Sequence, residues 1–267
     1  MHNGAIMPSE VRHRVDADQA FPLVRLTGVL DRGTAPQVRA ALLDVLADQP
    51  AAIVVDVADL RPAQPEAVAV LREVRRETAD WPAARLALCD PHDTGRWQDT
   101  GWPVWSDSAD AFGSFGSPDR DHRLSLGLEP LVGAARRSRE LITEACDRWD
   151  RADLAGASCI VVTEMVNNVV AHARTPMIVL LATRGSGLSV AVRDESTIAP
   201  AFSGAPAPTA YGGRGMLLID SIAARWGNLV LSHGKVVWAL LGGTEEETLG
   251  DAEREIDDAG MADPLPG

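Results

Sequence analysis

The chain of 267 residues is long enough for two ordinary domains, and its hydrophobic content of 46% is that of a globular protein. No uninterrupted apolar run approaches the ~18 residues of a membrane span, and no basic segment followed by an apolar one opens the sequence, so we expect a cytoplasmic protein. A formal net charge of −13 provides no basic stripe for a phosphate backbone, which argues against direct nucleic-acid binding.

Much of the negative charge lies at the C-terminal end. Nine acidic residues and one arginine follow position 244. They predict an acidic tail over 245–267, whose expected role is to keep the protein in solution rather than to bind a partner.

The three cysteines are Cys89, Cys146 and Cys159. They are odd in number and widely spaced, and no pair has zinc-ligand spacing. This pattern is typical of buried free thiols in a reducing compartment.

The first half of the chain alternates between strand and helix patterns. Strand patterns lie at 11–15, 23–27, 53–57, 85–89 and 103–105, and the second of them loses its alternation at Gly28. Helix patterns lie at 34–50, 67–78 and 106–112, the first with Thr34 as its cap and Pro36 in its first turn. Such alternation predicts a small α/β sheet with right-handed crossovers.

Two segments in this half carry a family resemblance. The stretches 28–31 (Gly-Val-Leu-Asp) and 53–56 (Ile-Val-Val-Asp), with the helix between them, resemble the sulfate-transporter and anti-sigma-antagonist (STAS) domain in its antagonist form. The stretch 100–111 is similar to the closing strand and helix of that family. The resemblance implies a STAS-like antagonist domain over 1–114.

The region after the Val-Asp strand departs from this family. Antagonists have an Asp-Ser-Ser/Thr-Gly turn there, and the partner kinase phosphorylates its hydroxyl. Neither Ser nor Thr occurs between Ala51 and Glu77 here, so we expect a docking or dimerising module instead of a switch. Glu66 either imitates a phosphoserine, with about half its charge, or complements a helix N-terminus.

The second half shows sequential hairpins and three helices. Glycine, serine and proline in 115–122 predict a linker. Strand patterns follow at 124–128, 177–182, 188–193, 229–232 and 236–241, and helix patterns at 129–148, 161–173 and 214–225. This arrangement predicts an antiparallel sheet with helices on one face.

The run 161–173 predicts one amphipathic helix with an unusual polar edge. Glu164, Asn168 and His172 follow each other at four-residue intervals beside a continuous apolar arc. A solvated helix face usually consists of Lys, Glu and Arg, whereas Asn has only a moderate helix propensity. The strip is therefore a candidate site, and a plain solvated face is the alternative.

Three segments together carry a second resemblance. The strip Glu-x-x-x-Asn-x-x-x-His, then Arg193-Asp194, then 212–216 (Gly-Gly-Arg-Gly-Met) resemble the ATP-binding boxes of the gyrase, chaperone, histidine-kinase and mismatch-repair ATPase superfamily. The variant is closest to the bacterial anti-sigma factor serine kinases. The resemblance implies a histidine kinase-like ATP-binding domain over 123–244, a Bergerat-type α/β sandwich that uses ATP and Mg²⁺.

The resemblance also implies roles for single residues. Glu164 would accept a proton from an attacking water or serine hydroxyl, and the Asn168 carbonyl would be a Mg²⁺ ligand. Asp194 would accept a hydrogen bond from the adenine amine, although Ser196 stands where the family normally has glycine. A packing or hydrogen-bonding role is expected for His172, and Asn167 is expected to support the nearby loop.

The glycine segment is the expected phosphate site. Its members are Gly212, Gly213, Arg214, Gly215 and Met216. Glycines let the backbone approach phosphates, the following helix N-terminus offers free amides, and an arginine adds a charge-assisted contact. There is no P-loop motif in the chain.

Two functions are compatible with these features. The first is an ATP- and Mg²⁺-dependent serine/threonine kinase that phosphorylates a separate anti-sigma factor antagonist. The second is a non-catalytic regulator of partner switching that captures a sigma factor or an antagonist. Glu164 and Asn168 favour the kinase, whereas Ser196 weakens it. Either function is compatible with a homodimer.

Overall fold

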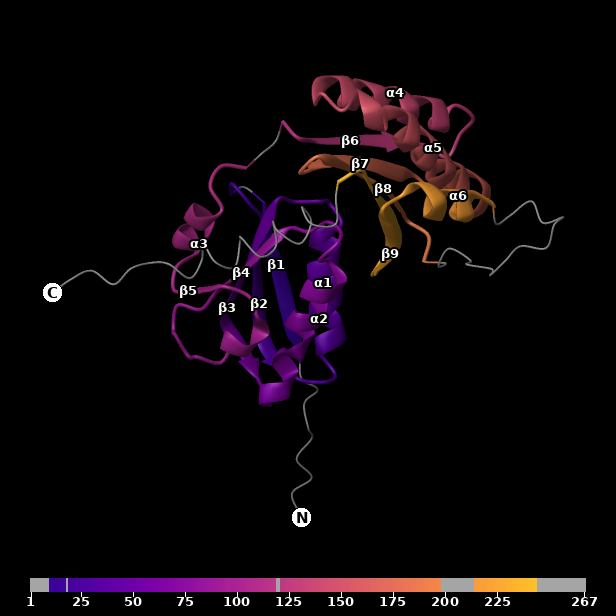
Figure 1. The fold of residues 1–267 in the computed structure, drawn as a ribbon. Coiled ribbons are helices and arrows are strands. Elements are labelled where there is room, and N and C mark those ends of the chain that lie inside the picture. The colour runs from indigo at the N-terminus through magenta and orange to yellow at the C-terminus, as the bar shows by residue number, and fades with distance from the viewer. Residues whose placement is uncertain (1–9, 18, 119–120, 198–213, 244–267) are drawn as a thin grey trace, which may run out of the picture. The chain divides into compact units, whose positions relative to one another are not determined.

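The computed structural model describes residues 10–17, 19–118, 121–197 and 214–243. The chain divides into two compact units, Met1–Asp119 and Arg120–Gly267, and each has its own five-stranded sheet (Figure 1). The predicted linker, 115–122, spans this division. The predicted acidic tail, together with Gly212 and Gly213, lies outside the described residues.

The first unit is a mostly parallel α/β sheet. Its strands, in spatial order, are β1 (Val11–Asp16), β2 (Leu23–Leu30), β3 (Ala52–Pro62), β4 (Arg85–Cys89) and β5 (Val104–Trp105). The connections hold α1 (Ala35–Leu46), η1 (Pro65–Val68), α2 (Ala69–Glu77) and η2 (Gln98–Thr100), and α3 (Ser108–Ser114) follows the last strand. Among the described strands of this sheet, only β1 pairs antiparallel, so the predicted small α/β fold is confirmed.

Helices cover both faces of this sheet. The helices α1 and α2 pack together on one face, and α3 lies on the other (Figure 1). The central strand β3 is therefore apolar on both sides, as its sequence predicts: Ile53, Val54 and Val55 are fully buried. On the α3 face, Phe21 packs edge-to-face against Phe115 with ring centroids 5.4 Å apart.

The structure modifies two local predictions in this unit. The strand β2 does not end at Gly28 but continues to Leu30. Gly28 has φ +115° and a β-carbon there would lie 2.1 Å from the Glu10 carbonyl oxygen, so glycine lets β1 and β2 approach closely. Thr34 occupies the N-cap position of α1, as predicted, but its hydroxyl makes no capping hydrogen bond. That hydroxyl accepts from the Asp31 amide at 2.9 Å and closes the turn after β2.

The second unit is an antiparallel sheet with helices on one face, as predicted. Its strands, in spatial order, are β6 (Arg123–Leu128), β7 (Met177–Arg184), β8 (Gly187–Asp194), β10 (Gly234–Leu241) and β9 (Arg225–Leu231). Its helices are α4 (Ala134–Arg148), α5 (Ala152–Asn168), which runs into the π-helical turn η3 (Val169–Ala173), and α6 (Arg214–Ile222). Two predicted boundaries move: α4 begins at Ala134, after 129–133, and Arg225 starts β9 instead of ending the helix.

The helix α5 is the centre of the second core. Val161, Val162, Met165 and Val166 are buried, and α5 packs against α6, β8 and β10. By length and composition alone, the helix over Ala152–Ala173 could cross a membrane. In this structure its apolar side instead forms part of the packed core of the unit.

Candidate functional site

In the structure, the polar edge of α5 extends over one turn, from Glu164 to Asn168. Glu164 and Asn168 are both half-buried, because the apolar residues beside them face the core. The third member of the predicted strip is not part of it. The α-helix ends at Asn168, the π-helical turn η3 changes the spacing, and His172 is exposed. Asn167 is exposed as well.

The N-terminus of α6 lies against this edge. A β-carbon on Gly215 would stand 2.5 Å from Glu164 Oε2, so the glycine backbone and the carboxylate are in close contact. One residue later, Asn168 Nδ2 lies 3.6 Å from Met216 Sδ. The structure therefore brings together four of the residues that the sequence predicts, from two distant segments.

This contact suits negative charge. The first turn of a helix exposes amide groups and the positive end of the helix dipole, which stabilises carboxylates and phosphates. The Glu164 carboxylate lies next to that turn through Gly215. The side chain of Arg214, the first residue of α6, lies outside the described residues.

Asp194 lies elsewhere on the same unit, at the end of β8. Its pairing register places it between Met177 of β7 and Lys235 of β10. It is only 2% exposed. Its Oδ1 accepts two hydrogen bonds, from the Ser196 amide at 2.7 Å and from Lys235 Nζ at 3.0 Å.

Lys235 is a polar residue of this site that local sequence patterns do not indicate. Its ammonium also donates to the Ser196 carbonyl oxygen at 3.2 Å. In the sequence it follows His-Gly in a hairpin turn, where lysine is usually solvated. The signal that finds it is its position directly opposite Asp194, and this depends on the pairing of β8 with β10, strands that are not neighbours in sequence.

The predicted site residues thus form two groups. Glu164 and Asn168 contact α6, whereas Asp194 contacts β10 and its own turn. Among the described residues, no hydrogen bond or ion pair joins the two groups. Nor do three or more His, Cys, Asp or Glu side chains gather as a metal cluster in the described part of the chain.

Glu164 and Asn168, beside the start of α6, fit a metal-bound triphosphate better than Asp194 fits the adenine ring of the nucleotide. A carboxylate and an amide carbonyl are hard oxygen donors of the kind that Mg²⁺ prefers, and both stand beside a helix N-terminus. Asp194 is the residue that resembles the aspartate to which the adenine amine donates a hydrogen bond. One of its oxygens already has two donors from within the protein.

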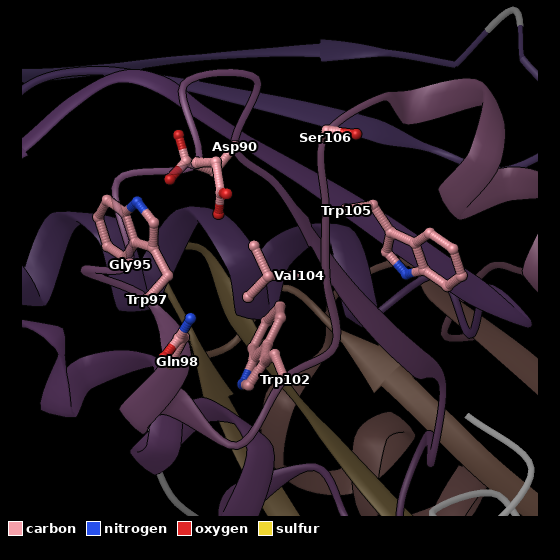
Figure 2. A pocket seen from close by; sticks show the side chains of 9 residues that line it. Asp90, Gly95, Trp97, Gln98, Trp102, Val104, Trp105 and Ser106 are labelled. Atoms are coloured by element: carbon pink, nitrogen blue, oxygen red, sulfur yellow. The ribbon is translucent and has the colours of Figure 1, made fainter. Parts of the chain in front are cut away.

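The first unit has a pocket of about 330 Å³ beyond the carboxyl ends of β4 and β5. Figure 2 shows Trp97, Trp102 and Asp90 around it. Both indoles are almost fully buried, at 2% and 3% exposure. The Asp90 carboxylate accepts from the amide and hydroxyl of Thr94, at 2.9 and 2.7 Å. These side chains hold the loop together, and this structural role explains their burial and hydrogen bonds without a ligand.

A second hollow, of about 310 Å³, lies between α1 and α2 at the carboxyl ends of β2 and β3. Charged side chains line it, among them Arg32, Arg39, Glu66 and Glu73. None of the described residues that line it is Ser or Thr, and the nearby Thr34 is 2% exposed. This hollow therefore offers no accessible hydroxyl among its described lining residues.

Comparison with known proteins supports the assignment of the first unit. Residues 13–81 match the protein family described as Mlab, STAS domain. This match confirms the STAS resemblance for that part of the chain. No curated protein matches the chain.

Two solved structures are similar at low identity. The first is an anti-sigma factor antagonist from Mycobacterium paratuberculosis, 20% identical, with 41% of this chain and 97% of that chain covered and a TM-score of 0.35. The second holds the RsbU and RsbW domains of Rv1364c from Mycobacterium tuberculosis, 18% identical, with 47% of this chain covered and a TM-score of 0.32. This chain covers only 33% of that second one.

Proposed function

We propose that the protein is a partner-switching regulator of the anti-sigma factor type, whose second unit binds ATP with Mg²⁺ and phosphorylates a serine on a separate antagonist. The observation that carries this proposal is the contact between α5 and α6. Gly215 lies against Glu164 and Met216 against Asn168. The resemblance to the anti-sigma factor kinases assigns these same residues to one nucleotide site.

Each residue of this contact has a chemical task in the proposal. Mg²⁺-ATP, when bound, supplies the phosphoryl group and the metal charge that neutralises it. Asn168 offers a neutral carbonyl ligand, so it adds no negative charge beside the phosphates. Glu164 accepts the proton of the serine hydroxyl. The amides at the start of α6 favour the phosphate oxygens.

The STAS-like unit acts as a docking module in this proposal. The hollow between α1 and α2 has no Ser or Thr among its described lining residues. A phosphoryl group from the second unit therefore has no acceptor at that place in its own chain. This supports a separate antagonist as the substrate.

A non-catalytic regulator is the second candidate, and the buried ion pair favours it. Lys235 and Asp194 have side chains that are 9% and 1% exposed. Lys235 neutralises the carboxylate that resembles the adenine acceptor. If the pair prevents nucleotide binding, the second unit captures a sigma factor or an antagonist without chemistry.

Titration calorimetry with ATP, with and without Mg²⁺, tests the nucleotide site. We expect Mg²⁺-dependent binding by the wild type and the loss of that dependence in Asn168→Ala. Asn167→Ala is the matched control, because Asn167 has the same side chain one position earlier and is exposed. A wild type that binds no ATP in either condition contradicts the proposal.

Phosphoryl transfer to a serine-containing antagonist separates the two candidates. Glu164→Gln should keep ATP binding and lose activity by about a hundredfold or more, the usual contribution of a general base. If the wild type binds ATP and Mg²⁺ but transfers no phosphate, the non-catalytic function replaces the kinase.

A further inference from the structure

The pocket beyond the carboxyl ends of β4 and β5 is a cavity that the proposed function does not use. Its volume of about 330 Å³ lies within the range of small-molecule sites, roughly 300–1,000 Å³. In open α/β sheets, binding sites lie outside the carboxyl ends of the strands. The strands β4 and β5 are parallel, and Asp90 and Ser106, which directly follow them, both line the pocket. The place and the size of this pocket therefore suit a small molecule.

The indole nitrogen of Trp97 is a hydrogen-bond donor that the fold leaves unused. The side chain is only 2% exposed and lines the pocket. None of the described residues accepts a hydrogen bond from its Nε1, whereas Trp102 Nε1 donates to the Leu71 carbonyl oxygen at 3.1 Å. Figure 2 shows the nitrogen of the Trp97 indole on the side of the ring where Asp90 lies. A buried donor without a partner is costly, so the acceptor for Trp97 has to come from outside the protein.

Two carboxylates line the same pocket without a cation beside them. They belong to Asp90 and Asp93, and none of the described lining residues is Arg, Lys or His. Asp90 is 3% exposed, and within the described part of the chain its Oδ1 accepts one long hydrogen bond, from the His92 amide at 3.3 Å. Asp93 is exposed, and no described side chain pairs with it. Carboxylates with spare acceptor capacity favour a ligand that brings a positive charge, and the faces of indole rings attract cations as well.

We propose that this pocket binds a small organic amine that carries an oxygen acceptor. The ammonium group pairs with Asp90 and Asp93, and the oxygen accepts from Trp97 Nε1. The apolar body of the ligand lies against Trp102 and Val104, an apolar side chain that is 37% exposed at the pocket. The site belongs to the first unit, so it is independent of the nucleotide site proposed for the second.

The test is NMR titration of the full-length, ¹⁵N-labelled protein with three probes of similar shape. Tyramine has an ammonium and a hydroxyl group, phenethylamine lacks the hydroxyl, and 4-hydroxyphenethyl alcohol has a hydroxyl in place of the ammonium. Tyramine should shift the indole N–H signal of Trp97, which Trp97→Phe identifies. Its dissociation constant should be about tenfold lower than that of the alcohol and about fivefold lower than that of phenethylamine, because a charged contact contributes more than a neutral hydrogen bond.

Asp93→Asn tests the role of the charge. Asp93 has φ +45°, a left-handed conformation that asparagine also adopts readily, so the variant should keep the fold. Its affinity for tyramine should fall about fivefold, whereas its affinity for the uncharged alcohol should change by less than about twofold. Asp99→Asn is the matched control, because Asp99 is an exposed aspartate of the same connection between β4 and β5 that does not line the pocket. This control should bind tyramine as the wild type does.

Three results overturn the inference. They are equal dissociation constants for the three probes, equal tyramine affinity in the wild type and Asp93→Asn, and a wild type whose pocket signals no probe shifts. If Trp97→Phe does not fold, the backbone amide signals of Gly95 and Gln98, which line the same pocket, provide the dissociation constants instead.

Discussion

Gly215 at the start of α6 packs so closely on Glu164 that a β-carbon would stand 2.5 Å from the carboxylate Oε2. Gly215→Ala should therefore displace the carboxylate, while the fold survives because the end of a Glu side chain is flexible. Under the proposed function, a base moved by this amount loses about a hundredfold in phosphoryl transfer. Single-turnover transfer from radiolabelled ATP measures it.

Binding is the internal control for Gly215→Ala. The affinity for ATP, measured by calorimetry, should stay within about threefold of that of the wild type. The reason is that the three atoms nearest to the added methyl group all belong to Glu164, and none to the Asn168 carbonyl. A variant with normal transfer would show that the Glu164 carboxylate has no fixed place in the reaction.

Gly156 lies on the exposed side of the same helix as Glu164, and a β-carbon there has no atom within 4 Å. Because alanine is the better helix former, Gly156→Ala should stabilise the second unit by about 0.5 to 1 kcal/mol. Urea unfolding followed by far-UV circular dichroism measures this. It is also the matched glycine control for Gly215→Ala, and its transfer activity should be that of the wild type. A destabilised Gly156→Ala would contradict the observed space around this residue.

The buried ion pair should be costly to break. Truncating one partner leaves the other charge buried, so Lys235→Met and Asp194→Ala should each lower the free energy of unfolding by about 3 kcal/mol or more. The double variant Lys235→Met/Asp194→Leu should lose much less than the sum of the single ones, since it leaves no charge behind.

The exposed pair of Arg136 and Glu140 provides the comparison for this measurement. Their side chains are 78% and 59% exposed, and Arg136→Met should cost less than about 1 kcal/mol. Equal losses in the buried and the exposed pair would mean that Lys235 and Asp194 are not coupled as the structure shows.

Local patterns in the sequence were enough to predict both folds. The continuous apolar run around Val54 predicts a strand covered on both faces, and the hairpin around 184–187 predicts antiparallel neighbours. The local predictions that were wrong concern positions whose structure depends on contacts between distant segments. Gly28 remains part of β2 because β1 passes close to it. The alternation of polar and apolar residues along β2 does not indicate this close approach.

The same distinction applies to the site. Glu164 and Asn168 share one helix, so their spacing alone places them together. His172 leaves the strip because a π-helical turn begins at Val169, and no composition signal in 169–173 indicates it. The partner of Asp194 could not be predicted, because Lys235 reaches it only through a strand pairing across the sheet.

The three cysteines should differ in reactivity. Burial, with smaller contributions from Asp56 and other acids, raises the pKa of Cys89 to about 11, and burial also raises the pKa of Cys146. Cys159 is half-buried. Since thiolates are the reactive form, iodoacetamide at pH 8 should label Cys159 well before the other two. Peptide mass spectrometry of the native protein checks the order, and rapid labelling of Cys89 would contradict it.

The raised pKa of Cys89 also predicts a loss of stability in alkali. The unfolded thiol loses its proton near the ordinary pKa of 9.0, whereas the folded one keeps it up to about 11. Between these values the unfolded state binds fewer protons, so the contribution of Cys89 to stability is complete below pH 9 and falls as the pH rises through this window. Urea unfolding at several pH values measures the slope. Cys89→Ala should be less stable at every pH because it leaves a small cavity, but its slope from pH 9 to 11 should be shallower than that of the wild type. Equal slopes would show that this thiol titrates alike in the folded and unfolded states.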